Sequence, residues 1–562
     1  MHLLESCNRT VKCIPVVHEV AAGIATEYFN EVSCGEGKAF AMVTSGPGLT
    51  NIITAVAGAY LDSRELLVLG GQVKVPDLSR GAVRQRGMQE VDGIALTRPI
   101  TEKSILMDVA MDRAQFAESI RCGIHGRKAP VFIEIPLDIQ GAQVEEELLL
   151  TPVAKTVPDI PVVSEAAIDV IAQAIRAAQR PVILLGGGIH RATTENLQEA
   201  MAAYGVPLML TWAATDRVPS DHPLYFGRPN TWGMRYSNVL MQQADLLVAL
   251  GSRLGLQQTG FNWQQFVPGG DVIQVECDPA ELTKGHPTIA MPVCGDANAV
   301  LTGLLKRDGG HHEEWVQFCR DTHQALPLVE PVNKTGEEYL SPYIFIAELG
   351  KLARPEDVMI PCSSGSAYTV TMQTFQQKHG QRVVTTRGLA SMGYGLSGAI
   401  GAAFASNGRR TILVEGDGGF MQNLQELGTV AANQLNLKIF VFDDNGYASI
   451  RMTQLNYFDG RYVGCDVKTG LGIPKWDHLF AAYGFSLLGL RPGFQNDSEF
   501  LDRFNAPGPA AFMVHIDPMQ TYFPKISSRV TATGGMESNP LHLLTPELDA
   551  ETAARVFRYL PR

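Results

Sequence analysis

Two acidic residues in the last third of the chain have the spacing and the neighbours expected of metal ligands. Asp417 lies in the glycine-rich run Gly416–Gly419, and Asp444 stands 27 positions later, directly before Asn445 and Gly446. Carboxylate oxygens are preferred ligands of hard divalent cations such as Mg²⁺, and the amino terminus of a helix attracts phosphate. The pair therefore predicts a site that holds a cation and a phosphate together. Gly-Asp-Gly alone is also an ordinary turn, so the prediction depends on the spacing.

The elements around these acids must form one strand–helix–strand unit. Apolar runs predict strands over residues 410–415 and 436–442, and apolar residues at helical spacing predict a helix over 422–434. Residues 416–419 read as a glycine turn between the first strand and the helix. Both acids then follow the carboxyl ends of parallel strands, where open α/β sheets bind ligands.

A third carboxylate stands near the start of the chain. Cys13–Val17 reads as a strand, 20–29 as a helix, and Glu19 lies at the junction between them. An apolar environment would bury Glu19, raise its pKa and suit it to exchange a proton with a heterocycle nitrogen. Alternatively, Glu19 is an ordinary first-turn acid favoured by the helix dipole.

The 562 residues fit three domains. Apolar strands alternate with helices, which predicts an α/β fold of three consecutive doubly wound parallel sheets. The predicted domains cover residues 1–150, 160–330 and 338–530, followed by a tail over 531–562 that could serve as a lid or an interface arm. Residues 151–163 read as an extended linker.

Composition excludes several classes of protein. The net charge of −12 argues against nucleic-acid and anionic-membrane surfaces. No apolar run reaches the length of a membrane span. The nine cysteines form no Cys-x-x-Cys pair, so neither a zinc site nor a disulfide framework is predicted. A soluble, cytoplasmic protein is expected.

Further motifs give the chain a resemblance to a known family. They are His18-Glu19, the run 44–48 (Thr-Ser-Gly-Pro-Gly) with Asn51, 71–73, Gln89-Glu90, 96–100, 131–136, 391–395 (Ser-Met-Gly-Tyr-Gly) and the Gly-Asp-Gly unit. With these motifs the chain resembles the acetolactate synthase branch of the thiamine-diphosphate enzymes over nearly its whole length. The resemblance implies a pyrimidine-binding first domain, a flavin- or nucleotide-type middle domain and a diphosphate-binding third domain.

The resemblance also implies roles for single residues. Glu19 would bond the aminopyrimidine nitrogen of thiamine diphosphate, Met392 would force the cofactor into its bent shape, and Gln89 would line the substrate side. Met392 could instead be core filler. Mg²⁺ would be held by Asp417, Asp444 and the carbonyl of Gly446, and the cofactor also by Gly416, Gly418, Gly419 and Tyr447.

A flavin site is expected in the middle region. A strand enters the glycine run 186–188 there, as in dinucleotide sites. By resemblance, FAD would contact Gly187, Arg235, Gly251, Arg253, Asp278 and Asp296. Alternatively, the region is a degenerate flavin domain that binds nothing or ADP.

Several positions depart from the family pattern. Asp444 replaces an Asn, which adds a negative charge beside the diphosphate. In the substrate pocket, Leu137 replaces a Lys, Met88 a Phe and Thr453 a Trp, so the acceptor pocket should be wider and more polar. The family's first strand and its glycine turn have no counterpart before Met1-His2-Leu3, so the first strand is expected to be missing.

The expected activity is decarboxylation of pyruvate, or a related 2-keto acid, with transfer of the two-carbon unit to a carbonyl acceptor. The acceptor is either a second pyruvate or a bulkier ketone such as a keto-sugar nucleotide, as in relatives from polysaccharide and branched-sugar biosynthesis. A flavin-linked pyruvate oxidase, a simple 2-keto-acid decarboxylase and a non-catalytic nucleotide-binding subunit remain alternatives. The family implies a homodimer or homotetramer with the active site at the subunit interface.

Overall fold

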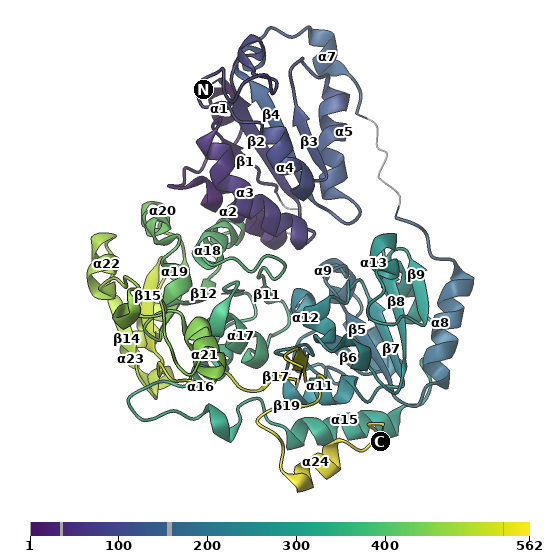
Figure 1. Ribbon diagram of the computed structural model, residues 1–562. Coiled ribbons are helices and arrows are strands. Elements are labelled where there is room, and N and C mark those ends of the chain that lie inside the picture. Colours follow the sequence, from purple (N-terminus) through teal and green to yellow (C-terminus); the bar gives the residue numbers. More distant parts are fainter. Residues whose placement is uncertain (1, 34–36, 154–159, 532, 562) are drawn as a thin grey trace. The chain divides into compact units, whose positions relative to one another are not determined.

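The computed structural model describes residues 2–33, 37–153, 160–531 and 533–561. It contains two compact units (Figure 1). The first unit comprises residues 1–158, 356–368 and 384–515, and the second comprises 159–355, 369–383 and 516–562. Three parallel sheets run through the chain, so the predicted α/β fold with three parallel-sheet regions is confirmed. Of the predicted linker, residues 154–159 lie outside the described residues.

The first unit holds two of the three sheets. One sheet has the parallel strands β1 (Ala41–Val43), β2 (Leu66–Gln72), β4 (Pro130–Pro136) and β3 (Lys103–Leu106), in that spatial order. Of the other sheet, the first unit holds the strands β10 (Val358–Pro361), β12 (Thr411–Gly416), β13 (Leu437–Asp443), β15 (Ala510–His515) and β14 (Leu487–Leu490), in that spatial order. Each central strand is almost wholly apolar because both of its faces are covered by helices.

Helices surround both sheets of this unit. With the first sheet lie α1 (His2–Asn8), α2 (Glu19–Ser33), α3 (Pro47–Leu61), α4 (Gly93–Thr97), α5 (Arg113–Ile124), α6 (Leu137–Gln140) and α7 (Glu146–Leu150). With the other lie α18 (Tyr394–Ala405), α19 (Asp417–Phe420), α20 (Leu427–Asn433), α21 (Ala448–Tyr457), α22 (Trp476–Ala482) and α23 (Ser498–Asn505).

One hydrophobic core joins the two sheet regions of the first unit. Ile24 and Tyr28 of α2 are fully buried and belong to the same cluster as Tyr394 and Ile400 of α18. Glycines allow the close approach, because a Cβ at Gly398 would lie 2.7 Å from the Tyr28 ring. Helices α2 and α18 therefore lie side by side (Figure 1), and residues far apart in the sequence share one rigid support.

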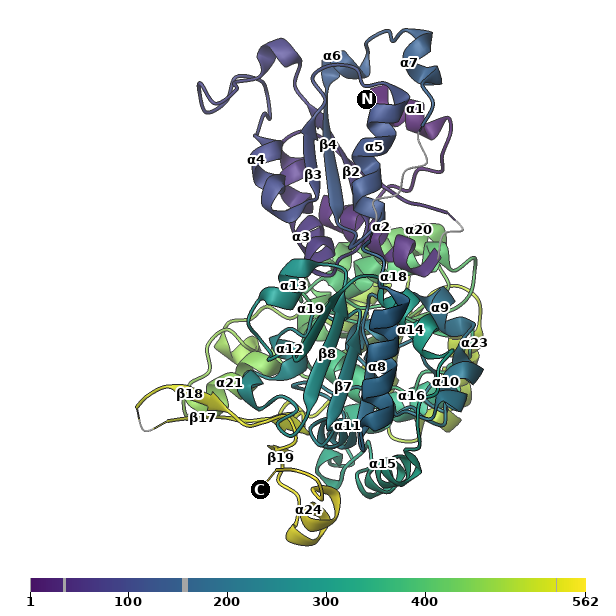
Figure 2. The same cartoon turned by 90° about the vertical axis from the view of Figure 1, so that its right-hand side faces the viewer.

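The second unit is built on the parallel sheet β6 (Leu208–Leu210), β5 (Pro181–Leu185), β7 (Leu246–Leu250), β8 (Asp271–Glu276) and β9 (Met291–Cys294). Its longer helices include α8 (Glu165–Ala177), α11 (Arg235–Met241), α14 (Ala297–Leu304), α15 (Glu313–Ala325), α16 (Pro342–Leu352) and α24 (Ala550–Val556). Helix α8 covers one face of the sheet (Figure 2). Among the described residues, no helix is long and apolar enough to cross a membrane.

The C-terminal tail is built into the second unit. Leu541 and Val556 are about 1% exposed and belong to the core around the central sheet, and α24 lies beside α15 (Figure 2). A short antiparallel pair forms between β16 (Lys525–Ile526) and β19 (Leu544–Thr545), and another between β17 (Ser528–Val530) and β18 (Met536–Ser538). Residues 541 and 556 thus support the fold of this unit.

Three local predictions were wrong. Cys13–Val17 is not a strand but an irregular segment that leads into α2; the amide of Val17 bonds a side chain instead of a neighbouring strand. In place of the predicted glycine turn at 416–419, Gly416 ends β12 and the other residues belong to the short helix α19 (Asp417–Phe420). The predicted helix over 422–434 is divided into a 3₁₀ turn, Leu424–Glu426, and α20.

Candidate active site

The two predicted acidic ligands follow neighbouring parallel strands. Asp417 is the first residue of α19 directly after β12, and Asp444 directly follows β13. The strands pair with Gly416 opposite Phe442, which brings their carboxyl ends together. Both acids are buried, with 1% and 3% of their surface exposed. The structure therefore assembles the acidic corner that the spacing predicted.

Backbone amides fix the carboxylate of Asp417. Its Oδ1 accepts a hydrogen bond from the amide of Gly418 at 2.7 Å, and its Oδ2 accepts one from the amide of Gly446 at 2.8 Å. Burial raises the pKa of Asp417 well above its usual range, and the nearby charges of Asp444 and Asp443 raise it further. A divalent cation would offset this repulsion, so the donor set fits Mg²⁺.

Asp444 has a cationic neighbour of its own. Nη2 of Arg451, a buried residue of α21, donates to the main-chain carbonyl of Asp444 at 2.7 Å and lies 3.7 Å from its carboxylate. The positive charge of Arg451 partly balances the negative charge of Asp444, which stands where the family has an uncharged Asn. Arg451 has no role in the sequence-based prediction, although it is a basic residue seven positions after Asp444.

Close backbone packing explains two glycines of this corner. A Cβ at Gly418 would lie 2.4 Å from the ring of Tyr447, and one at Gly446 would lie 2.4 Å from the carbonyl oxygen of Cys465. Gly446 also has φ of 124°, which non-glycine residues rarely adopt. Added Cβ atoms would displace the amides that bind Asp417. At Gly416 a Cβ would meet open space, and at Gly419 it would lie 3.0 Å from Glu415.

The first region assembles a second group of predicted residues. Glu19 is the first residue of α2, and its Oε2 accepts a hydrogen bond from Nδ2 of Asn51 in α3 at 3.0 Å. Gly46 precedes α3 with φ of 64°, and a Cβ there would lie 2.3 Å from the carbonyl oxygen of Gln89. Glu19 is half-buried in the single chain, so its expected full burial is not observed there.

Met392 lies in the turn before α18. It is half-buried and does not belong to the core clusters known for the described residues, which argues against a role as core filler. Gly393 has φ of 82°, and its carbonyl oxygen accepts a hydrogen bond from Nδ2 of Asn423 at 2.7 Å. The Sδ of Met392 lies 3.6 Å from Nε2 of Gln422. The turn that presents Met392 is thus held by the segment that follows α19.

The predicted substrate-pocket residues are all exposed in the single chain. Met88 is 85% exposed and Leu137 41% exposed. Thr453 is also exposed and donates its hydroxyl to the carbonyl of Ser449 one turn earlier at 2.9 Å. Their roles toward a substrate stay predictions.

Glu426 is the residue that the sequence reasoning missed. It is fully buried, and its carboxylate accepts hydrogen bonds from the amides of Val17 and His18, directly before Glu19. The only signal in the sequence was an acid between Leu424 and Leu427, within a segment whose periodicity predicts a buried face.

In the second unit, the glycine turn is explained by packing. The amide of Gly188 bonds the carbonyl of Gly251 at 2.9 Å, and a Cβ at Gly186 would lie 2.1 Å from that carbonyl oxygen. A Cβ at Gly187 would lie 2.9 Å from Ala213. The glycines that suggested a dinucleotide site are therefore needed to let the loops after β5 and β7 touch.

The residues predicted to contact flavin in this unit differ in their surroundings. Arg235 is 4% exposed and forms an ion pair with Glu330 at 2.7 Å, while Nη1 bonds the carbonyls of Leu544 and Pro546. The guanidinium of Arg235 thus already binds protein groups, and its role toward FAD stays a prediction. Asp278 and Asp296 cap α13 (Pro279–Thr283) and α14. Arg253 is half-buried beside Gly251, and its role stays a prediction.

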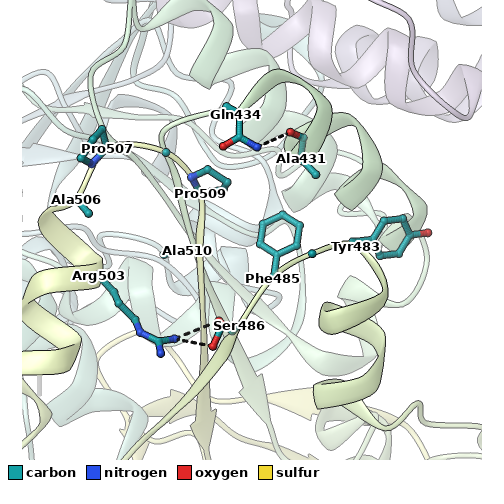
Figure 3. Close-up of a pocket in the computed structure, with 12 residues that line it drawn as sticks. Ala431, Gln434, Tyr483, Phe485, Ser486, Arg503, Ala506, Pro507, Pro509 and Ala510 are labelled. Carbon is teal, nitrogen blue, oxygen red and sulfur yellow. Dashed lines mark hydrogen bonds between the residues drawn. The ribbon is translucent and has the colours of Figure 1, made fainter.

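A cavity of about 470 Å³ in the first unit lies away from these residues (Figure 3). Ser486 and Ala510, which line it, stand at the amino ends of β14 and β15. Arg503 on its wall bonds Ser486 (Figure 3). The acidic corner stands at the carboxyl ends of the same sheet, so this cavity is not the predicted site.

Comparison with known proteins agrees with this arrangement. The N-terminal TPP-binding, central, and C-terminal TPP-binding domains of thiamine pyrophosphate enzymes match residues 1–96, 168–304 and 363–509. The large subunit of acetolactate synthase isozyme 1 of Escherichia coli is 31% identical over 525 residues, covering 93% of this chain and 90% of that protein. Isozyme 2 is 30% identical over 514 residues, covering 91% and 89%. The large subunit from Corynebacterium glutamicum is 30% identical, covering 88% and 79%. The chain belongs to the acetolactate synthase family of thiamine-pyrophosphate enzymes.

Proposed function

We propose that this protein decarboxylates pyruvate and joins the two-carbon unit to a second pyruvate, giving acetolactate. The observation that carries the proposal is similarity to acetolactate synthases over more than nine-tenths of the chain. Two features of the site support it. The acidic corner of Asp417 and Asp444 suits the diphosphate with its cation, and the Glu19–Asn51 pair suits the heterocycle.

Each group of residues has a distinct task in this proposal. Thiamine diphosphate, when bound, supplies the carbon nucleophile and electron sink on which a 2-keto acid loses CO₂. Asp417, Asp444 and the carbonyl of Gly446 would hold Mg²⁺, whose charge would offset that of the diphosphate. Glu19 holds and moves a proton at the pyrimidine ring nitrogen, and Asn51 orients its carboxylate. Met392 and Gln89 shape the space beside the reacting carbon.

The test is product analysis with pyruvate as the only substrate, plus Mg²⁺ and thiamine diphosphate. Two pyruvate molecules should give one acetolactate and one CO₂. Glu19→Gln should lower kcat by about 10²- to 10⁴-fold while cofactor binding persists. Acetaldehyde as the main product would overturn the carboligase in favour of a simple decarboxylase. Failure to bind thiamine diphosphate in calorimetry would favour a non-catalytic subunit.

A bulkier ketone is the second candidate acceptor. Thr453 stands where the family has Trp, and Leu137 where it has Lys; both positions are exposed. A smaller residue leaves room for a larger acceptor, and loss of the Lys removes a partner for a second carboxylate. Competition between pyruvate and a keto-sugar nucleotide in one reaction decides between them. If the mixed product is absent at excess ketone, pyruvate is the acceptor.

We propose FAD as a ligand of the second unit, with Gly187, Arg235, Gly251, Arg253, Asp278 and Asp296 near it. Mass spectrometry of the purified protein identifies any bound flavin or ADP. Anaerobic bleaching of flavin absorbance by pyruvate at the rate of turnover would instead indicate a pyruvate oxidase.

A further inference from the structure

A buried carboxylate holds the main chain directly before Glu19. Oε1 of Glu426 accepts hydrogen bonds from the amides of Val17 at 3.1 Å and His18 at 3.0 Å. Its Oε2 accepts one from the hydroxyl of Thr429 at 2.6 Å and lies 3.3 Å from the amide of Val17. Glu426 has no exposed surface. Hydrogen bonds to an ionised acceptor are about twice as strong as neutral ones.

These bonds replace the strand pairing that the sequence predicted for this segment. Cys13–Val17 belongs to no sheet, so the amide of Val17 needs another acceptor, and Glu426 provides it from a segment 409 positions later. His18 also accepts a hydrogen bond from the amide of Val20 through its Nδ1, at 3.2 Å. The chain therefore enters α2 in one fixed geometry, and Glu19 is the first residue of that helix.

The same short segment also supports Met392. Asn423 donates to the carbonyl of Gly393 at 2.7 Å, and Glu426 follows Asn423 by three residues. The segment comes directly after α19, which begins at Asp417. One piece of chain thus fixes the turn that presents Met392 and the entry to the helix that presents Glu19.

We propose that Glu426 is a positioning residue that holds Glu19 in the geometry needed for proton transfer. A misplacement of about 1 Å from a distant change can cost about 10²-fold in rate. Among the described residues, the carboxylate of Glu426 hydrogen-bonds Val17, His18 and Thr429 and neither Asp417 nor Asp444, so we expect its effect to pass through the main chain at residues 17 and 18. This inference rests on the proposed function.

The test uses the full chain and two isosteric variants. Glu426→Gln keeps the size of the side chain and one acceptor oxygen, but it removes the charge that strengthens the hydrogen bonds of Val17 and His18 and replaces Oε2 by an amide group that faces the amide of Val17. Without cofactor, hydrogen exchange at the amides of residues 17 and 18, followed by mass spectrometry, should speed up at least about tenfold. Thr429→Val is the matched control, since it removes a donor to the same carboxylate and leaves both amide bonds in place.

With Mg²⁺ and thiamine diphosphate, proton exchange at C2 of the bound thiazolium reports on Glu19 independently of any acceptor. We expect Glu426→Gln to slow this exchange and kcat by about 10- to 100-fold, with KM for pyruvate and cofactor affinity changed less than about threefold. The double variant with Glu19→Gln should be no slower than Glu19→Gln alone.

Several outcomes would overturn the inference. One is a rate of C2 proton exchange in Glu426→Gln equal to that of the wild type. Another is a double variant whose loss of rate equals the full sum of the losses in Glu426→Gln and Glu19→Gln. If Glu426→Gln does not fold, Glu426→Asp is tested instead. It keeps the charge but shortens the side chain by one methylene, so it should also slow C2 exchange. A wild-type protein that neither binds thiamine diphosphate nor accelerates its C2 exchange would refute the proposed function instead, so the two failures are distinguishable.

Discussion

Asp417 and Glu134 are both buried carboxyl residues, but their surroundings differ. Asp417 accepts two amide hydrogen bonds at the carboxyl end of a strand, where a cation can bind. Glu134 lies inside β4, is 2% exposed, and its Oε1 has no hydrogen-bond partner among the described residues. Burial raises the pKa of Glu134 to about 7; the hydrogen bond of Gln72 opposes the shift and the charges of Asp92 and Glu90 add to it.

This environment predicts a pH-dependent stability. The folded protein keeps the proton of Glu134 up to pH about 7, whereas an unfolded Glu releases it near pH 4.5. Stability should therefore fall as pH rises from about 4.5 to about 7 and stay constant above. Glu134→Gln should remove this component. Urea unfolding should show similar midpoints for the two proteins at pH 4.5, and at pH 8 the wild type should be the less stable by up to roughly 3 kcal/mol. An equal difference at both pH values would contradict the assignment.

Single residues of the site could be predicted to different extents. Asp417 and Asp444 were found because their sequence spacing follows from the length of a strand–helix–strand unit. The protein partners of Arg235 could not be predicted, because sequence order does not show that Glu330 and the carbonyls of residues 544 and 546 bind its guanidinium. Glu426 was missed because its partners are main-chain amides, which every residue type except proline carries.

At the scale of elements, substitutions in the loop after β5 can test whether its glycines are needed for close packing against the loop after β7. We predict that Gly186→Ala lowers the free energy of unfolding by roughly 2–4 kcal/mol, because its Cβ would lie 2.1 Å from the carbonyl oxygen of Gly251. Gly255→Ala is the control: that Cβ meets open space at φ of −72°, so the change should stay within about 0.5 kcal/mol. Thermal unfolding of flavin-free protein measures both. A Gly186→Ala variant of normal stability that had lost a bound flavin would restore the cofactor explanation.

Elements with a regular buried pattern were predicted well. The apolar runs predicted as strands over 410–415 and 436–442 are the central strands β12 and β13, since burial on both faces selects continuous apolar sequence. Cys13–Val17 carries the same kind of run and is not a strand. Its apolar side chains could not show that a carboxylate from a distant segment would take the place of a neighbouring strand.

At the scale of the whole molecule, the proposed dimer makes a sharp prediction. If Glu19 of one subunit serves the same cofactor as Asp417 of the partner, Glu19→Gln and Asp417→Asn damage different halves of each site. Each variant alone should be inactive. After mixing, unfolding and joint refolding, half of the dimers are mixed and each mixed dimer has one intact site, so about a quarter of wild-type activity should return. Activity that stays absent, although light scattering shows mixed dimers, would place both residues in one subunit's site.

The core of the second unit is closed by residues that are synthesised long after its central strands. Leu541 and Val556 complete the packing around strands that begin at residue 181. The nascent central sheet must therefore wait, with apolar surface uncovered, until synthesis has passed residue 556. Ribosome-bound chains that stop before residue 541 should recruit chaperones at this sheet, whereas chains that extend beyond 556 should release them.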